Sequence, residues 1–229
     1  MGRKRRGQPI HGWVAIDKPT GRTSAQVTAK VRRMLDAAKA GHGGTLDPIA
    51  TGVLPIALGE ATKTVSYVMD GQKRYRFTVR WGEERTTDDL EGDVTNVNVG
   101  RPSEAEILSV LPEFIGVIEQ VPPDFSAIKL DGKRAYDLAR AGEVVTIAKR
   151  EVYIEEFSLV SMPDEDHEVF EVASGKGTYM RSLARDIARR LGTVGHIAEL
   201  RRTHCGPFSE TASISLESLE TLVHSAPPS

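Results

Sequence analysis

The chain is poor in cysteine, in aromatic residues and in long apolar runs. Cys205 is the one cysteine among 229 residues, so no internal disulfide can form and no cysteine pair is available for a structural zinc site. We therefore expect neither redox nor metal chemistry. No apolar run reaches the roughly eighteen residues that span a bilayer, and the basic residues 1–6 lead into no secretory apolar segment. These absences predict a globular protein of the cytoplasm that has no contact with a membrane.

Neither sign of charge is in clear excess. The formal net charge is −2, which argues weakly against a nucleic-acid binder, because phosphates are contacted mostly by Lys and Arg. The basic residues nevertheless gather in three segments, 18–39, 129–150 and 176–202. Two interpretations stay open: a one-sided basic face that binds nucleic acid, and ordinary solvated surface charge.

Apolar spacing predicts helices in three places. Apolar residues at helical spacing favour a helix over 24–38 with Ser24 near its N-cap. Ser103 and Glu106 fit a capping box for a short helix that reaches residue 111. A third apolar stripe predicts a helix over 178–191 that stops at Gly192.

Other apolar segments are typical of strands. The clearest has Tyr75, Phe77, Val79 and Trp81 alternating with basic or polar residues, which is the period of a half-buried strand. Acidic residues 83–93 are expected to form a turn or loop. Strands are predicted over 11–17, 74–81, 115–121, 144–148, 152–160 and 169–173. Together with the helices they predict an α+β protein with a mixed, mainly antiparallel sheet.

Residues 41–59 hold five glycines and two prolines, too many for a long helix or a central strand. We expect a shaped loop there. Within it, Asp47 precedes Pro48, and Asp before Pro commonly starts a turn. A phosphate-binding loop is excluded because its Gly-Lys-Ser/Thr ending is missing. Local chemistry alone favours a structural turn at Asp47 over a chemical role.

Several longer motifs stand in one order along the chain. They are Asp17-Lys18-Pro19-Thr20-Gly21-Arg22-Thr23-Ser24, Gly41 through Pro48, Ala50 through Pro55, Gly59-Glu60-Ala61-Thr62-Lys63, Lys73-Arg74-Tyr75-Arg76, Val121-Pro122-Pro123, Lys176 through Leu183, and Leu200-Arg201-Arg202-Thr203. In sequence and spacing this set resembles the TruB family of pseudouridine synthases over most of residues 11–210. The resemblance implies the pseudouridine synthase fold, an α+β sheet flanked by helices and RNA-binding loops.

The resemblance also implies an isomerase that detaches the base of one uridine, rotates it and rejoins it through carbon, without cofactor or metal. Asp47 matches the family's nucleophile, and attack on C1′ of the ribose or on the base both stay open. Arg181 matches an arginine that pairs with this aspartate; without the resemblance it would be a solvated helix position.

Four further residues match the family's substrate pocket. Tyr75 corresponds to a tyrosine that stacks on the extruded base, and Tyr179 and Leu200 to residues that line the same pocket. His42 corresponds to a histidine that reaches into the RNA beside the flipped nucleotide. From local pattern alone, each of these residues would be assigned to packing or to a turn.

The implied partner is the T-arm stem–loop of tRNA, with no obligatory protein partner and no guide RNA. Residues 129–150 correspond to a loop region that covers the RNA. We expect a basic flexible N-terminus over 1–10, a catalytic domain over 11–210 and a tail over 211–229. The second, PUA-type module of such chains is expected to be absent, either naturally or by truncation.

Two alternative functions stay open at this point. One is an RNA-binding protein that grips a flipped uridine and performs no chemistry. The other is an isomerase of ribosomal or guide-selected RNA, because target choice depends on shape and surface contacts.

Overall fold

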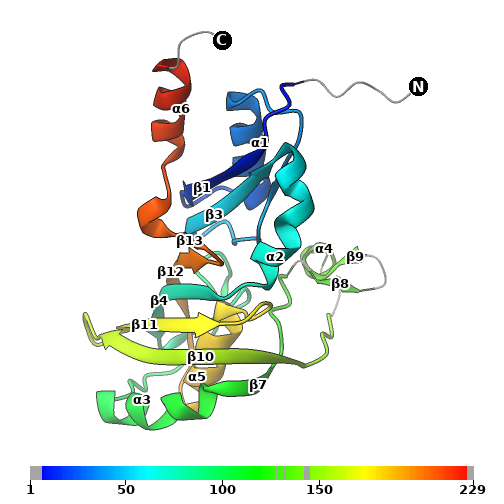
Figure 1. Ribbon diagram of the computed structural model, residues 1–229. Coiled ribbons are helices and arrows are strands. Elements are labelled where there is room, and N and C mark those ends of the chain that lie inside the picture. Colours follow the sequence, from blue (N-terminus) through cyan, green and yellow to red (C-terminus); the bar gives the residue numbers. More distant parts are fainter. Residues whose placement is uncertain (1–6, 127, 131–132, 142–144, 226–229) are drawn as a thin grey trace. The chain divides into compact units, whose positions relative to one another are not determined.

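The computed structural model describes residues 7–126, 128–130, 133–141 and 145–225. The chain divides into two compact units that alternate along the sequence (Figure 1). Unit 1 contains residues 1–75 and 201–229, and unit 2 contains residues 76–200. Strands β4 and β12 each contribute residues to both units.

Unit 1 is built on strand β3 (Thr51–Leu58). Strand β1 (Gly12–Lys18) pairs with it antiparallel, and the short β2 (Ala40–His42) pairs antiparallel with its second half. The last part of β12 (Gly195–Cys205) pairs with the start of β3 in parallel and carries β13 (Phe208–Ser209). Its helices are α1 (Ser24–Met34), α2 (Val65–Asp70) and α6 (Leu216–Ser225), with 3₁₀ turns at Gly59–Thr64 and Glu210–Ala212.

The prediction of a loop throughout 41–59 is wrong, because β3 is a buried strand with partners on both sides. Pro55 lies inside it, opposite Ala15 of β1. Proline gives no ladder N–H, yet its carbonyl still accepts a hydrogen bond from the Gly43 N–H at 2.8 Å. One missing donor is tolerated where neighbouring strands hold the remaining residues.

Helix α1 starts as predicted but ends earlier. Its N-cap is Thr23, whose side chain forms a capping box with Gln26. The helix ends at Met34, and Asp36 then takes a φ of 45° that redirects the chain. The apolar spacing that runs on to residue 38 is therefore not helical at its end.

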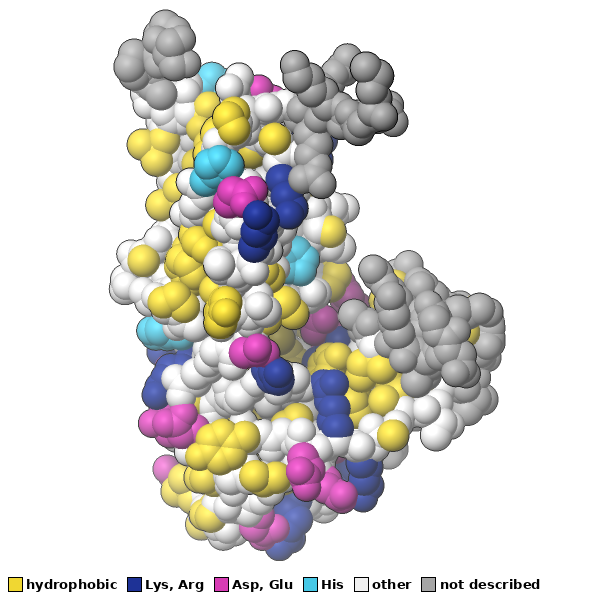
Figure 2. All heavy atoms as spheres, turned by 45° about the vertical axis from the view of Figure 1, so that its right-hand side comes forward, with side chains coloured by type: hydrophobic (Ala, Val, Ile, Leu, Met, Phe, Trp, Pro, Cys, Tyr) yellow, Lys and Arg dark blue, Asp and Glu magenta, His cyan; other side chains and the backbone are white. Residues whose placement is uncertain are grey.

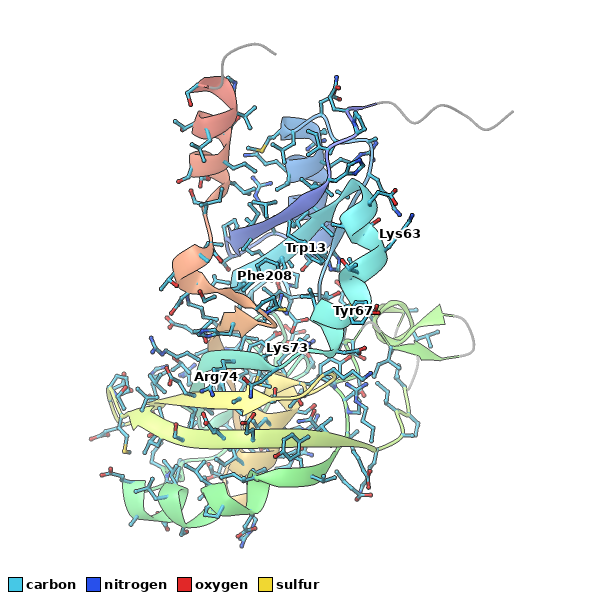
Figure 3. All side chains as sticks on the ribbon, in the orientation of Figure 1. Trp13, Lys63, Tyr67, Lys73, Arg74 and Phe208 are labelled. Atoms are coloured by element: carbon cyan, nitrogen blue, oxygen red, sulfur yellow. The ribbon has the colours of Figure 1, made fainter. Side chains whose placement is uncertain are left out.

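A small apolar core closes unit 1. Val53, Val68 and Cys205 are buried together, and Trp13 and Phe208 pack against them. The two rings lie 5.5 Å apart, and Figure 3 shows them side by side. This core joins α2 to β3 and β12.

Unit 2 is a second, mainly antiparallel part of the sheet, in the order β12-β4-β11-β10-β7. The predicted strands 74–81, 115–121, 152–160 and 169–173 are confirmed. They correspond to β4 (Lys73–Trp81), β7 (Gly116–Gln120), β10 (Arg150–Ser161) and β11 (His167–Ser174). Two small hairpins add β5 (Glu83–Arg85) with β6 (Val94–Val97), and β8 (Lys129–Leu130) with β9 (Lys133–Arg134).

The helices of unit 2 are α3 (Glu104–Val110), α4 (Ala135–Arg140) and α5 (Met180–Arg190), with a 3₁₀ turn at Leu111–Phe114. The capping box of Ser103 with Glu106 is confirmed. So is the stop at Gly192, whose φ is 72°. Among the described residues, no helix is both long and apolar enough to cross a membrane.

An aromatic core packs between the strands of unit 2. Phe170 stacks on Phe77 at 5.6 Å and meets the edge of Trp81 at 6.4 Å. All three side chains are at most 1% exposed. The alternation of β4 therefore has its predicted cause, one apolar face turned into a core.

Three further expectations about unit 2 were wrong or incomplete. The strand expected near 144–148 is absent over residues 145–148, where Ile147 is buried without any strand ladder; Val144 lies outside the described residues. The acidic segment 83–93 begins as strand β5 rather than as a loop. Strand β12 was not predicted, because basic and polar residues interrupt its apolar pattern.

Candidate active site

Asp47 lies in a turn between β2 and β3. The Ala50 N–H donates to the Asp47 carbonyl at 3.1 Å, which closes a four-residue turn with Pro48 in second place. Asp first and Pro second is a preferred order for such a turn. The turn that local chemistry predicted is therefore present, and the half-buried side chain of Asp47 projects from it.

The glycine half of the Asp47 loop is held by two buried side chains. The Arg202 guanidinium donates to the carbonyls of Gly44 at 3.1 Å and Thr45 at 3.5 Å. The Ser24 hydroxyl donates to the Leu46 carbonyl at 3.1 Å and accepts from the Leu46 N–H at 2.8 Å. The residues just before Asp47 are thus fixed from β12 and from α1.

The second half of the loop is held from the end of β1. The Lys18 ammonium, fully buried, donates to the carbonyls of Pro48 at 3.1 Å and Ala50 at 2.6 Å. The Thr20 hydroxyl donates to the Ile49 carbonyl at 3.2 Å. Every carbonyl from residue 44 to residue 50 therefore accepts a hydrogen bond. A loop whose carbonyls are all bonded holds its backbone in one geometry, which is a requirement for placing a side chain precisely.

Tyr75 lies in the same unit, at the start of β4. Burial of its hydroxyl raises the pKa of Tyr75 above its ordinary value, although the residue as a whole is half-buried. The charge of Arg202 and a hydrogen bond with it act in the opposite direction, and the charge of Asp47 adds to the rise. Asp47 and Arg202 therefore both lie within electrostatic range of Tyr75.

His42 ends β2, five residues before Asp47. Burial lowers its pKa, and the positive charge of Arg202 lowers it further, so the imidazole is neutral near pH 7. Its buried Nδ1 has no hydrogen-bond partner among the residues that the structure describes. His42 and Tyr75 thus share one charged neighbour, Arg202.

Unit 2 positions the remaining predicted residues. The Gln120 side chain brackets the backbone of Tyr179: its amide accepts from the Tyr179 N–H at 2.8 Å and donates to the Tyr179 carbonyl at 3.1 Å. The Arg150 guanidinium lies over the Tyr179 ring, 4.6 Å from its centre. Leu200, near the middle of β12, is 7% exposed.

Arg181 is buried, so the alternative of a solvated helix position is wrong. Its guanidinium donates to the carbonyls of Thr87 at 3.0 Å and Phe125 at 2.9 Å, and lies 3.7 Å from the Asp89 carboxylate. Burying a guanidinium is costly unless it is paired and hydrogen-bonded. Its predicted pairing with Asp47 stays a prediction, as does the convergence of all six predicted residues.

Sequence reasoning missed three of the side chains that hold the Asp47 loop. Lys18 and Arg202 stood inside the quoted motifs, but nothing in the pattern marks a charged residue as fully buried. Ser24 was read as a possible helix cap, while the cap is Thr23 and Ser24 bonds the loop instead. Because Thr23 already caps the helix, the adjacent Ser24 was the one residue of this group whose position could have indicated a different bonding partner.

Most basic residues of segment 176–202 have acidic partners. Arg185 pairs with Asp88, Arg189 with Glu84, Arg190 with Glu113, and Arg201 with Asp17 and Glu210. On the face drawn in Figure 2, Lys and Arg side chains stand beside Asp and Glu side chains. Arg189 and Arg190 of this segment carry ordinary surface charge, whereas Arg181, Arg185 and Arg202 are buried. In the described part of the chain, no group of His, Cys, Asp and Glu is arranged to hold a metal ion.

In this α+β chain a carboxylate on a fully hydrogen-bonded loop lies in the same compact unit as Tyr75 and the buried Arg202. Comparison with known families identifies the class of protein. The model of the TruB family pseudouridylate synthase N-terminal domain matches residues 32–180, and that of the tRNA pseudouridylate synthase B C-terminal domain matches residues 181–227. The chain belongs to the TruB family of pseudouridylate synthases.

Individual relatives agree with the family models. The tRNA pseudouridine synthase B of Brucella anthropi is 58% identical over 98% of this chain, which spans 69% of that protein. The one of Bradyrhizobium diazoefficiens is 60% identical over 96% of this chain, which spans 64% of that protein. Among solved structures, a chain of the Cbf5–Nop10–Gar1 complex matches with a TM-score of 0.73 and 33% identity, over 92% of this chain and 54% of its own length.

The predicted fold is therefore confirmed: an α+β pseudouridine synthase with a mixed sheet, mainly antiparallel, in which β3 and β12 form a parallel pair. The two family models meet between residues 180 and 181, whereas the compact units meet at residues 75/76 and 200/201. The predicted domain limits at residues 10 and 210 stay predictions.

Proposed function

We propose that this chain converts a uridine in the T-arm of tRNA into pseudouridine, with Asp47 as the nucleophile. The tRNA substrate is suggested by the names of its bacterial relatives. The observation that carries the proposal is the Asp47 loop, in which every carbonyl from 44 to 50 is hydrogen-bonded. Such a loop supports a carboxylate that must meet one atom of an extruded nucleotide.

The reaction is an isomerisation, so its atoms balance without a co-reactant. The bond between C1′ and N1 breaks, the base rotates, a bond between C1′ and C5 forms, the proton on C5 leaves and N1 gains a proton. Asp47 acts as an ionised carboxylate, either on C1′ or on the base. Arg181 is proposed to pair with it and to favour the ionised form.

The aromatic and apolar residues are proposed to hold the extruded uracil. The Tyr75 ring offers a stacking surface, and its raised pKa keeps the hydroxyl protonated at neutral pH. Tyr179 and Leu200 are proposed to line the same pocket. Neutral His42 is suited to replace lost base stacking in the RNA, since an uncharged imidazole is a flat surface with little cost of desolvation.

The proposed partner is tRNA alone, and the proposed location is the cytoplasm. The related Cbf5 chain was solved in a complex with Nop10 and Gar1. For this chain we propose that no protein partner and no guide RNA are required. Activity of the purified chain on a T-arm stem–loop tests this directly.

The decisive experiment uses a T-arm stem–loop whose uridines carry tritium at C5. The purified chain should release tritium, and Asp47→Asn should release at least about a thousandfold less, because an amide does not replace a carboxylate nucleophile. Asp36→Asn is the matched control, since Asn tolerates its positive φ and the residue is exposed. Equal release by the chain and Asp47→Asn would refute the assignment of Asp47.

The same experiment separates the alternatives. If the chain binds the stem–loop in a gel shift and releases no tritium, it is an RNA-binding protein without this chemistry. If it releases tritium from a ribosomal RNA fragment and not from the T-arm, the proposed target is wrong while the reaction stands.

A further inference from the structure

Arg202 occupies an unusual place for an arginine. It is 1% exposed, and no carboxylate of the described residues lies within ion-pair distance of it. Its bonding partners are neutral: they are the carbonyls of Gly44, Thr45 and Val53, the last at 2.9 Å from Nε. Because no counter-ion neutralises this buried positive charge, it acts electrostatically on the titratable groups around it.

The guanidinium bonds two ends of the segment that contains Asp47. Gly44 and Thr45 lie before the aspartate, and Val53 lies in β3 after it. Only a planar fork with donors on three nitrogens reaches carbonyls in these separate directions. Moving the guanidinium would therefore release both ends of the segment at once.

The backbone around Arg202 is shaped to admit it. Gly44 has a φ of 132°, and a side chain there would meet the Arg202 Nη1 at 3.4 Å. Gly52 has a φ of 98°, and a side chain there would meet the Arg202 carbonyl oxygen at 2.2 Å. Gly52 thus leaves room for the backbone of Arg202, whereas the 3.4 Å at Gly44 is an ordinary van der Waals contact.

We propose that Arg202 is a positioning residue of the active site, which holds the Asp47 loop through Gly44, Thr45 and Val53. It does not touch the reacting atoms. It fixes the backbone on both sides of Asp47 from one rigid group. This inference rests on the proposed function and adds to it the residue that places the proposed nucleophile.

The test separates the shape of the guanidinium from its charge. Arg202→Lys keeps a positive charge but cannot reach three carbonyls, and Arg202→Met removes charge and donors. Arg201→Lys and Arg201→Met are matched controls, because Arg201 is the adjacent residue of the same strand and its side chain bonds Asp17 and Glu210 instead. All variants are made in the full chain.

Tritium release from the labelled T-arm stem–loop gives the first readout. We expect Arg202→Lys to lower kcat by about tenfold to a hundredfold, the cost of a misplacement near 1 Å, and to change KM by less than about threefold, since RNA contacts are kept. The Arg201 variants should keep kcat within about threefold of the original chain. An Arg202→Lys variant with unchanged kcat would overturn the proposal.

Titration without RNA gives the second readout. The imidazole of His42 is followed by NMR, with His42→Gln to assign its signal, and the Tyr75 hydroxyl by ultraviolet difference spectra against Tyr75→Phe. Because the charge of Arg202 lowers the pKa of both groups, both pKa values should rise in Arg202→Met. In Arg202→Lys, where the positive charge remains, both pKa values should stay close to those of the unsubstituted chain. Asp47 and Cys205 also raise the pKa of Tyr75, and both residues are unchanged in the two variants.

The outcomes distinguish this inference from the proposed function. If the original chain releases no tritium while both titrations respond as expected, the proposed reaction fails and the placement of Arg202 stands. If neither pKa moves in Arg202→Met, the placement itself is wrong. If Arg202→Lys does not fold while Arg201→Lys does, by circular dichroism, Arg202 is a residue of the fold and the positioning role is refuted.

Discussion

Replacing Gly52 by alanine is expected to destabilise unit 1 strongly. Gly52 has a φ of 98°, which L-residues rarely adopt. A Cβ there would lie 2.2 Å from the Arg202 carbonyl oxygen and 2.9 Å from its nitrogen. Both atoms belong to the backbone of β12, which pairs with β3 at this residue, so no side-chain rotation relieves the overlap.

The magnitude follows from two contributions. The positive φ costs an alanine roughly 1–2 kcal/mol, and forcing extra volume into a packed site costs typically about 1–3 kcal/mol. Gly52→Ala should therefore lose roughly 2–5 kcal/mol in unfolding free energy, which for a chain of this length lowers the melting temperature by about 4–20 °C. Gly21→Ala is the control: its φ is 76° and nothing lies within 4 Å of the added Cβ, so only the first contribution applies.

Urea and thermal unfolding of both variants, followed by circular dichroism, measure the difference. Gly52→Ala should unfold at lower urea and lower temperature than Gly21→Ala. Equal losses would show that the approach of β12 to Gly52 is not as close as described. The reasoning about Arg202 would then lose one of its supports, because the same contact sets its backbone.

Three further predictions concern unit 2. Gln120→Leu removes both hydrogen bonds to the backbone of Tyr179, and should cost about 1–3 kcal/mol and raise KM for the stem–loop in kinetic assays. Phe170→Ala empties the centre of the aromatic core and should cost about 3–5 kcal/mol by urea unfolding. Burial raises the pKa of Glu168 to about 8 from 4.5. Stability from the protonated carboxyl is then complete below pH 4.5 and is lost as the pH rises to about 8. Unfolding midpoints across this range should fall, and Glu168→Gln should remove that part of the slope.

The sequence predicted those elements whose pattern has a single physical cause. The alternation of β4 comes from one apolar face in a core, and the capping box of Ser103 needs only local atoms. Strand β3 was missed because Gly52 and Pro55 weaken a strand in isolation. Their tolerance depends on partners supplied by β1, β2 and β12. Tertiary pairing outweighed local propensity at that segment.

The candidate site shows the same division. The individual residues Asp47, Tyr75 and His42 could be named from motifs, but the burial of Arg202 could not be predicted from them. A fully buried arginine bonded to carbonyls has no pattern of its own, because neither its neighbours along β12 nor its charge indicates burial. Lys18 is the same case at the end of β1.

From local chemistry, a turn and a nucleophile were alternative roles for Asp47. In the structure the backbone of Asp47 forms the turn, so the two roles are compatible. The hydrogen bond from Ala50 to the Asp47 carbonyl is the turn, and it involves the backbone alone. Arg202, Ser24 and Lys18 bond the neighbouring carbonyls, so the backbone on both sides of Asp47 is held by other residues of the unit. A nucleophile on a loop whose backbone is fixed in this way stays a prediction, and the tritium-release assay with Asp47→Asn tests it.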